Sequence, residues 1–180
     1  MTRTTHLGAL TAAAGVLVAV GMLVLIVALV DPAGAAFPGK NGKIVFTTNR
    51  DGNYEIYTMN SDRNGPPSTW NVQRLTTNPA EDTDPTFNPE GTKIAFTTNR
   101  DGNSEIYTIN SDGTGVQRVT NDPGGADYAP AFSPDGSWLA YTAMYSSNAE
   151  IYTKKLDGTG GQRLTSTAAD DASPDWQPLP

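Results

Sequence analysis

A nearly identical phrase occurs three times in this chain after residue 40, in copies that span 42–90, 91–135 and 136–180. Each copy contains Glu-Ile-Tyr-Thr and, further along, Gln-Arg-Leu-Thr or Gln-Arg-Val-Thr. Self-similarity with a period of roughly 20–50 residues is typical of repeat proteins, in which each copy is one structural unit packed on its neighbours. Such proteins usually present extended surfaces to partners, so the repeats favour a binding role over a single catalytic pocket.

Each copy contains four short segments with the composition of β-strands. In the second copy they lie at 94–98, 105–109, 116–120 and 129–133, and the pair Asp101-Gly102 separates the first two. An Asp-Gly pair suits the positive φ angles of a tight hairpin turn. No segment after residue 37 has the period of an amphipathic helix. The predicted fold class is all-β, a β-propeller of three four-stranded antiparallel blades, with the apolar strand residues from Ile44 to Trp176 packed between blades.

The turn phrases between these segments resemble those of a known family. Residues 40–180 are similar to the PD40 (WD40-like) repeats of the TolB β-propeller family, through NRDGNSEIY at 99–107, DGTG at 112–115 and SPDG at 133–136. The resemblance implies four-stranded blades and, from TolB itself, a periplasmic role in binding other envelope proteins.

Three features depart from the family pattern. The first copy has NPEG at 88–91 in place of SPDG, and the third has YSSN at 145–148 in place of the Asp-Gly hairpin. TolB also carries an α/β domain ahead of a six-bladed propeller, whereas three repeats are recognised here. The resemblance therefore implies a fold and a general binding role, without a particular partner.

An apolar leader precedes the repeats. Residues 7–30 carry no charge and are apolar or small nearly throughout, with Arg3 ahead of them. This length can span a bilayer, and the small residues at 33–36 resemble a signal-peptidase site. We expect 1–36 to be a cleaved signal peptide or a retained transmembrane anchor. Residues 37–180 would then lie outside the cytoplasm, in the periplasm or the extracellular space.

Charge and cysteine content exclude several classes of function. The formal net charge is −7, and removal of residues 1–36 leaves it unchanged because one base, Arg3, and one acid, Asp31, are lost together. So acidic a chain lacks the basic patch expected of a nucleic-acid-binding protein. It would also be repelled by anionic lipid, which limits membrane contact to the N-terminal segment. The chain has no cysteine and so no disulfide.

Oxygen-bearing side chains at alternate positions beside the hairpin turns are the one candidate for a metal site. They are Asp51, Asn53 and Glu55 in the first copy and Asp101, Asn103 and Glu105 in the second. Oxygen-rich loops can hold Ca²⁺, although the spacing is not that of an EF-hand and the third copy lacks the aspartate. The favoured interpretation is structural, with no cofactor: Asp and Asn shape turns, and the glutamates form hydrogen bonds within or between blades.

Other repeated charges also favour structural roles. Arg74, Arg118 and Arg163 occupy one phase of the repeat and are predicted to form the same salt bridge in each blade. The acidic loops at 81–84 and 170–171 are predicted to be solvated turns or acceptors for backbone amides.

The residue inventory argues against an enzyme. His6, the single histidine, lies in the leader, and no Gly-x-Ser-x-Gly motif occurs. We predict a non-enzymatic scaffold for protein–protein interaction in the cell envelope or outside the cell. One alternative is a carbohydrate- or cell-wall-binding module using aromatic faces; another, less favoured, is a carboxylate-based glycan-active enzyme. The aromatic candidates are Tyr54, Tyr128, Tyr145 and Trp70.

The phase of the repeats predicts how the propeller is completed. The first copy opens on the strand around Ile44, the second of a blade, whereas 173–176 matches the first strand of a blade, at 129–133. Three blades are fewer than the usual range of about 4–8. We therefore expect a partial propeller unless oligomerisation completes it, as in a homodimer in which each C-terminal strand completes the partner's first blade.

Overall fold

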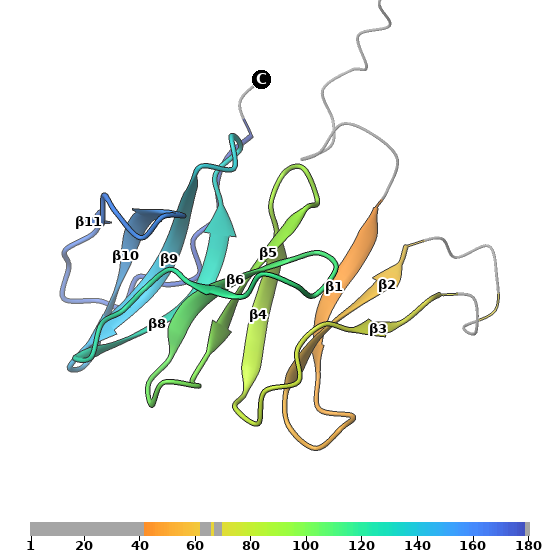
Figure 1. Cartoon of the computed structure of the whole chain (residues 1–180). Helices are drawn as coiled ribbons and strands as arrows, with labels where there is room; N and C mark the ends of the chain where they lie inside the picture. Colours follow the sequence, from red (N-terminus) through yellow and green to blue (C-terminus); the bar gives the residue numbers. More distant parts are fainter. Residues whose placement is uncertain (1–41, 62–65, 67–69, 179–180) are drawn as a thin grey trace, which may run out of the picture. The chain divides into compact units, whose positions relative to one another are not determined.

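The computed structural model describes residues 42–61, 66 and 70–178, and these residues form strands, turns and loops without a helix (Figure 1). The predicted leader, 1–36, and most of the loop at 62–69 lie outside the described residues. Within the described ranges, no helix is long and apolar enough to span a membrane.

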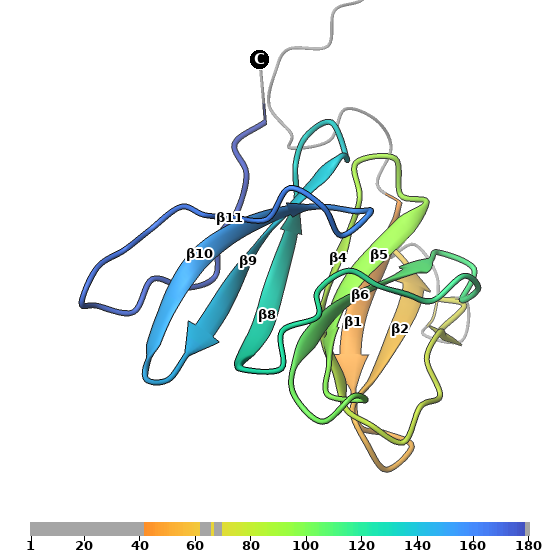
Figure 2. The same ribbon diagram turned by 60° about the vertical axis from the view of Figure 1, so that its left-hand side comes forward.

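The strands form three antiparallel sheets (Figures 1 and 2). The first contains β1 (Lys43–Thr48), β2 (Glu55–Asn60) and β3 (Gln73–Arg74). The second contains β4 (Asp82–Phe87), β5 (Lys93–Thr98), β6 (Glu105–Asn110) and β7 (Gln117–Arg118). The third contains β8 (Gly125–Phe132), β9 (Trp138–Tyr145), β10 (Asn148–Lys155) and β11 (Gln162–Arg163).

The predicted all-β propeller architecture is confirmed, with one difference in strand count. The second and third sheets have four strands in chain order, and the first has three among the described residues. A sheet thus begins with the last strand of one sequence repeat and continues with the first three strands of the next. β1 is consequently an edge strand, paired with β2 on one side and with no described strand on the other.

Strand alternation produces two apolar layers, one between each pair of neighbouring sheets. On β5, Ile94 and Phe96 point into the layer shared with the first sheet, together with Ile56 and Leu75. Their neighbour Ala95 points into the layer shared with the third sheet. Because blade strands are covered on both faces, consecutive residues of one strand are buried. The layer between the second and third sheets contains Ala95, Ile106, Val119, Phe132, Leu139, Tyr141 and Ala143.

The hairpins between the second and third strands of a blade follow the predicted chemistry. Gly102 has a φ of 104° and donates its amide to the Asn99 carbonyl at 3.0 Å. Glycine adopts this φ at no steric cost. In the third sheet, a two-residue turn joins β9 and β10, with Ser146 at a φ of 63°.

The prediction that Ile44 is packed between blades is wrong for the described unit. Its side chain is 38% exposed, whereas Ile94, at the same position of the next blade, is 0% exposed. The difference follows from the position of β1 at the end of the row of sheets, where no described sheet covers its outer face (Figure 2).

Candidate functional site

A buried glutamate binds an arginine at the same place in every blade, as the repeat phase of both residues predicts. In the second sheet, Glu105 is fully buried at the start of β6. Its Oε1 accepts a hydrogen bond from Nη2 of Arg118 at 2.8 Å, and its Oε2 accepts one from the Thr120 hydroxyl at 2.5 Å. Asn103 donates to Oε1 at 3.0 Å. A buried carboxylate with this many donors has its charge compensated.

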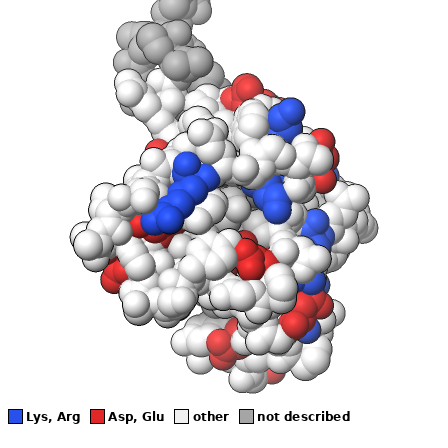
Figure 3. Space-filling model, turned by 90° about the vertical axis from the view of Figure 1, so that its left-hand side faces the viewer, with Lys and Arg blue, Asp and Glu red and all other residues white. Residues whose placement is uncertain are grey.

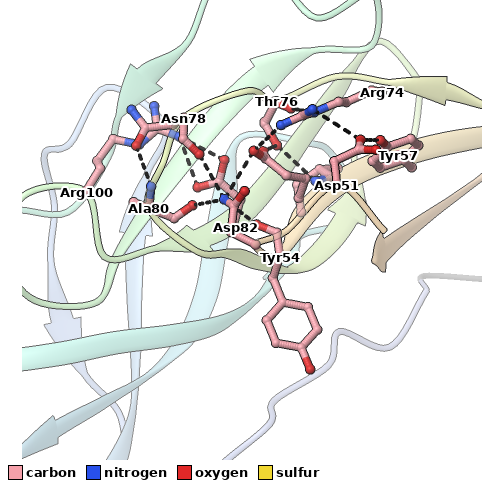
Figure 4. Close-up of polar contacts among 12 residues, drawn as sticks. Asp51, Tyr54, Tyr57, Arg74, Thr76, Asn78, Ala80, Asp82 and Arg100 are labelled. Atoms are coloured by element: carbon pink, nitrogen blue, oxygen red, sulfur yellow. Dashed lines mark hydrogen bonds and ion pairs between the residues drawn. The ribbon is translucent and has the colours of Figure 1, made fainter. Parts of the chain in front are cut away.

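The first blade repeats this cluster (Figure 4). Arg74 donates from Nη2 to Oε1 of Glu55 at 2.6 Å, and the Thr76 hydroxyl donates to Oε2 at 2.5 Å. Nη1 of Arg74 lies 3.1 Å from Oδ2 of Asp51, which also accepts the hydroxyl hydrogen of Tyr57. One arginine therefore ties the hairpin turn to the short third strand, β3.

The third blade keeps the glutamate and arginine without the hairpin aspartate. Arg163 donates from Nη2 to Oε1 of Glu150 at 2.5 Å, and the Thr165 hydroxyl donates to Oε2 at 2.5 Å. The Thr165 bond is the largest of the effects that lower the pKa of Glu150, and the Thr167 amide and Arg163 add to it. The predicted salt bridges of Arg74, Arg118 and Arg163 are thus confirmed.

These contacts show what the six calcium candidates do in the fold. Asp51, Glu55, Asp101 and Glu105 are bound by arginine. Asn53 and Asn103 donate to main-chain carbonyls of the loop that enters the next blade, at 2.7–2.9 Å. Across the described ranges, no three His, Cys, Asp or Glu residues gather as they would to hold a metal ion. The calcium site stays an expectation of the sequence, while the structure gives these atoms other partners.

A second buried carboxylate begins the first strand of a blade, and sequence reasoning misassigned it. The acidic loop at 81–84 is not simply a solvated turn, because Asp82 is fully buried at the start of β4. Nη2 of Arg100 lies 3.1 Å from both of its carboxylate oxygens. The Arg100 guanidinium also lies over the rings of Phe96 and Tyr107, 5.5 and 4.8 Å from their centroids. The signal was available, since Asp82 and Asp127 are in phase in the repeats.

Asp127 occupies the same position in the third sheet without an arginine. Tyr145 stands where the second blade has Arg100, and its hydroxyl instead donates to Asp122. Oδ1 of Asp127 has no hydrogen-bond partner among the described residues. Burial, opposed in part by the Thr120 hydroxyl, raises the pKa of Asp127 to about 7.

The aromatic candidates for a carbohydrate surface do not form one cluster with shared contacts. The Tyr54 ring is 42% exposed and lies away from the polar cluster in Figure 4. Tyr145 packs on Tyr152 with ring centroids 5.8 Å apart. Tyr128 and Trp70 are half-buried. In the view of Figure 3, acidic and basic side chains are interspersed among uncharged ones, so this face carries no basic patch.

The stacked four-stranded sheets, with their repeated Glu–Arg clusters, define a β-propeller repeat protein. The chain belongs to the PD40 family, described as the TolB beta propeller domain, whose model matches residues 32–125. A comparison with curated proteins found no match.

Solved propeller structures resemble the chain in part. A TolB of Acinetobacter baumannii is 27% identical, with a TM-score of 0.58 over 76% of this chain and 33% of that one. A TolB of Agrobacterium tumefaciens is 23% identical, with a TM-score of 0.60 over 68% of this chain and 45% of that one. An oligogalacturonate lyase of Vibrio parahaemolyticus, 14% identical, shares the fold with a TM-score of 0.60 over 77% of this chain and 40% of that one. This chain therefore spans less than half of each.

Proposed function

We propose that this protein is an exported, non-enzymatic scaffold that binds other proteins in the cell envelope or outside the cell. One observation supports it most: among the described residues, the row of sheets ends in a β1 edge without a paired strand and in apolar side chains without a covering sheet, such as Ile44 and Leu164. Unpaired edges and exposed apolar faces are typical of surfaces that associate with other polypeptides. Membership of the TolB propeller family is consistent with this role.

The pairing of the repeated charges favours binding over catalysis. The acidic and basic side chains that occur in phase are bound to each other, as Glu105 is to Arg118, so they maintain the blades. A catalytic site, by contrast, usually brings together different residue types at one place. A carbohydrate-binding role, our second candidate, would use exposed rings such as Tyr54. One solved structure with a similar fold is an oligogalacturonate lyase, an enzyme that acts on a glycan. It resembles this chain in fold alone.

Export is the part of the proposal that rests on the leader. An uncharged apolar stretch at 7–30, followed by small residues at 33–36, is typical of a signal peptide or an N-terminal anchor. The partners would then be envelope or extracellular proteins, and a second copy of this chain is included among them, joined through the C-terminal residues.

Capture from envelope extract tests this function. The full-length chain is expressed in an exporting host, and the form recovered is immobilised as wild type, as Ile44→Lys and as Val116→Lys. Val116 is 43% exposed and lies just before β7, so it is a matched control for a charge placed on an exposed apolar residue away from β1. We expect wild type and Val116→Lys to retain the same envelope protein and Ile44→Lys to retain less. Binding to a glycan array without protein capture would favour the carbohydrate-binding alternative.

A further inference from the structure

Residues 171–176, here named the C-terminal segment, occupy the place of a first blade strand beyond the third sheet. The amide of Asp82 donates to the Tyr54 carbonyl of the preceding blade at 2.8 Å, and the amide of Asp127 donates to the Ser104 carbonyl at 2.8 Å. The amide of Asp171 makes the same bond to the Ala149 carbonyl, also at 2.8 Å. The segment thus enters a new blade position as β4 and β8 do.

The C-terminal segment also repeats the backbone conformation of those strands. β4 and β8 each contain a shift in register near a non-glycine residue of positive φ, Asp84 at 51° and Ala129 at 52°. Ser173 has a φ of 56°. Its amide donates to the Thr142 hydroxyl at 2.9 Å, as that of Ala129 donates to the Thr97 hydroxyl at 3.2 Å. The segment is therefore shaped as a bulged strand before any neighbouring strand pairs with it.

β1 presents the complementary edge. In the second blade, β5 pairs with β4 so that Asp82 lies opposite Thr98 and within reach of Arg100. Arg50 repeats the arrangement of Arg100: its Nε donates to the Thr48 hydroxyl at 3.3 Å, and its guanidinium lies over the Phe46 and Tyr57 rings. No aspartate in the described ranges takes the place that Asp82 takes beside Arg100. Arg50 is thus placed to receive one.

The two ends of the row of sheets also expose matching apolar side chains. Val119 and Leu75 are nearly buried, at 4% and 7% exposure, under the next sheet, whereas Leu164 at the same phase of the third blade is 54% exposed. At the other end, Ile44 is exposed where Ile94 is covered. These are the two halves of an interblade layer, one at each end of the unit.

We propose that the β1 edge is the docking site for the C-terminal segment of a second copy of this chain. By equivalence with the pairing of β4 and β5, Asp171 lies opposite Thr48 and Trp176 lies opposite Ile44 of the partner copy, in antiparallel orientation. Asp171 pairs with Arg50 as Asp82 pairs with Arg100. This deepens the proposed function, on which it rests, by naming one protein partner and its register.

A second copy fits the edge better than the same chain does. β1 and β11 lie at opposite ends of the row of three sheets (Figures 1 and 2). Closure among the three described sheets alone would require a three-bladed ring, below the usual range of about 4–8 blades. Two copies related by a two-fold axis supply six blades and satisfy both edges at once, since a two-fold interface is self-complementary.

Charge exchange tests the pairing. Wild type, Arg50→Asp and Asp171→Arg are expressed as full-length chains in an exporting host, and their masses are measured by light scattering at micromolar concentration. We expect a dimer for wild type. Each single variant places like charges at both contacts of a homodimer and should dissociate at least about ten-fold more readily. An equimolar mixture of the two variants can form a heterodimer with opposite charges at both contacts, so it should regain the dimer mass.

Controls distinguish loss of the dimer contact from misfolding of the variants and from loss of the general binding function. Glu81→Arg makes the same change of charge on an exposed residue before β4 and should leave the dimer intact. Circular dichroism checks the fold of each variant. Because the chain lacks cysteine, Thr47→Cys mixed with Ala172→Cys should give a disulfide-linked dimer, whereas Thr47→Cys mixed with Ala168→Cys should not.

A monomeric wild type, single variants that dimerise normally, or a mixture that fails to recover would each overturn the strand exchange. If the edge is instead covered by another protein, envelope capture remains while the dimer is absent, so the scaffold function would stand and this inference alone would fail. Loss of envelope capture with an intact dimer would support the strand exchange and contradict the scaffold function.

Discussion

Nη2 of Arg100 lies 3.1 Å from each carboxylate oxygen of Asp82, which makes this buried pair the reference for the same position in every blade. Asp127 has the position and the burial of Asp82 but faces Tyr145 in place of an arginine. Burial raises the pKa of Asp82 as well, but the Thr98 hydroxyl and Arg100 oppose the rise, whereas Asp127 has no arginine among the described residues to do so. This difference has consequences for stability that can be measured.

The first prediction concerns the pH dependence that Asp127 imposes. Burial raises its pKa from 3.8 to about 7 in the folded state. The folded state therefore binds more protons than the unfolded state between these values, so the free energy of unfolding should fall as pH rises from about 4 to 7 and level off above. Asp127→Asn should remove this dependence and stabilise the protein at pH 8 by up to about 4 kcal/mol. Urea unfolding at pH 5 and pH 8 measures both effects.

Asp82→Asn is the matched control for that variant. It leaves the half-buried Arg100 guanidinium without its anion and should destabilise the protein by about 3–5 kcal/mol. The two substitutions are chemically identical and their effects at pH 8 should have opposite signs. Equal effects would contradict the assignment of Asp127 as the uncompensated carboxylate.

A second prediction compares the two acids that bind Arg118. Glu105 is fully buried, whereas Asp101 is partly exposed. Glu105→Ala should cost about 3–5 kcal/mol because it leaves a charge partly buried without its partner. Asp101→Ala should cost less than about 1 kcal/mol, as is usual for an exposed ion pair. Thermal unfolding with both variants at one pH measures the difference, and similar losses would argue against a structural role that depends on burial.

The third prediction separates the covered and uncovered faces. Phe96 is fully buried in the layer between the first two sheets, and Phe46, at the same phase, is half-buried on the outer face of β1. Phe96→Ala should cost about 3–5 kcal/mol. Phe46→Ala should cost less than half of that at low protein concentration, and more as concentration rises if a second copy covers this face. Denaturant unfolding at two protein concentrations provides the measurement.

The fourth prediction concerns processing of the leader. If residues 1–36 are a cleaved signal peptide, protein recovered from an exporting host should begin at or near Phe37. Intact-mass analysis determines the N-terminus. Recovery of the full-length chain alone, from the membrane fraction, would indicate a retained anchor.

Much of the fold could be predicted because the repeats report the same local rules three times. The hairpin around Gly102 follows from Asp-Gly chemistry, and the strands of the second copy follow from their β-branched and aromatic residues. The Glu105–Arg118 pair was also predictable, since residues that recur at one phase make the same contact in each blade. Asp82 was misassigned because one copy by itself does not distinguish an acidic turn from the buried start of a strand, and only the in-phase Asp127 of the next copy carries that signal.

The sequence by itself determined the period, the four-strand unit and the partners within one blade, because these depend on residues close along the chain. Tertiary structure alone decided which faces are covered, and so separated Ile94 from Ile44 and Val119 from Leu164 although each pair shares a phase. The match of 173–176 to a first blade strand was visible in the sequence, whereas the bonds of Asp171 and Ser173, shared with β4 and β8, came from the tertiary structure. Burial depends on the neighbouring sheet, and no local pattern specifies whether that neighbour is present.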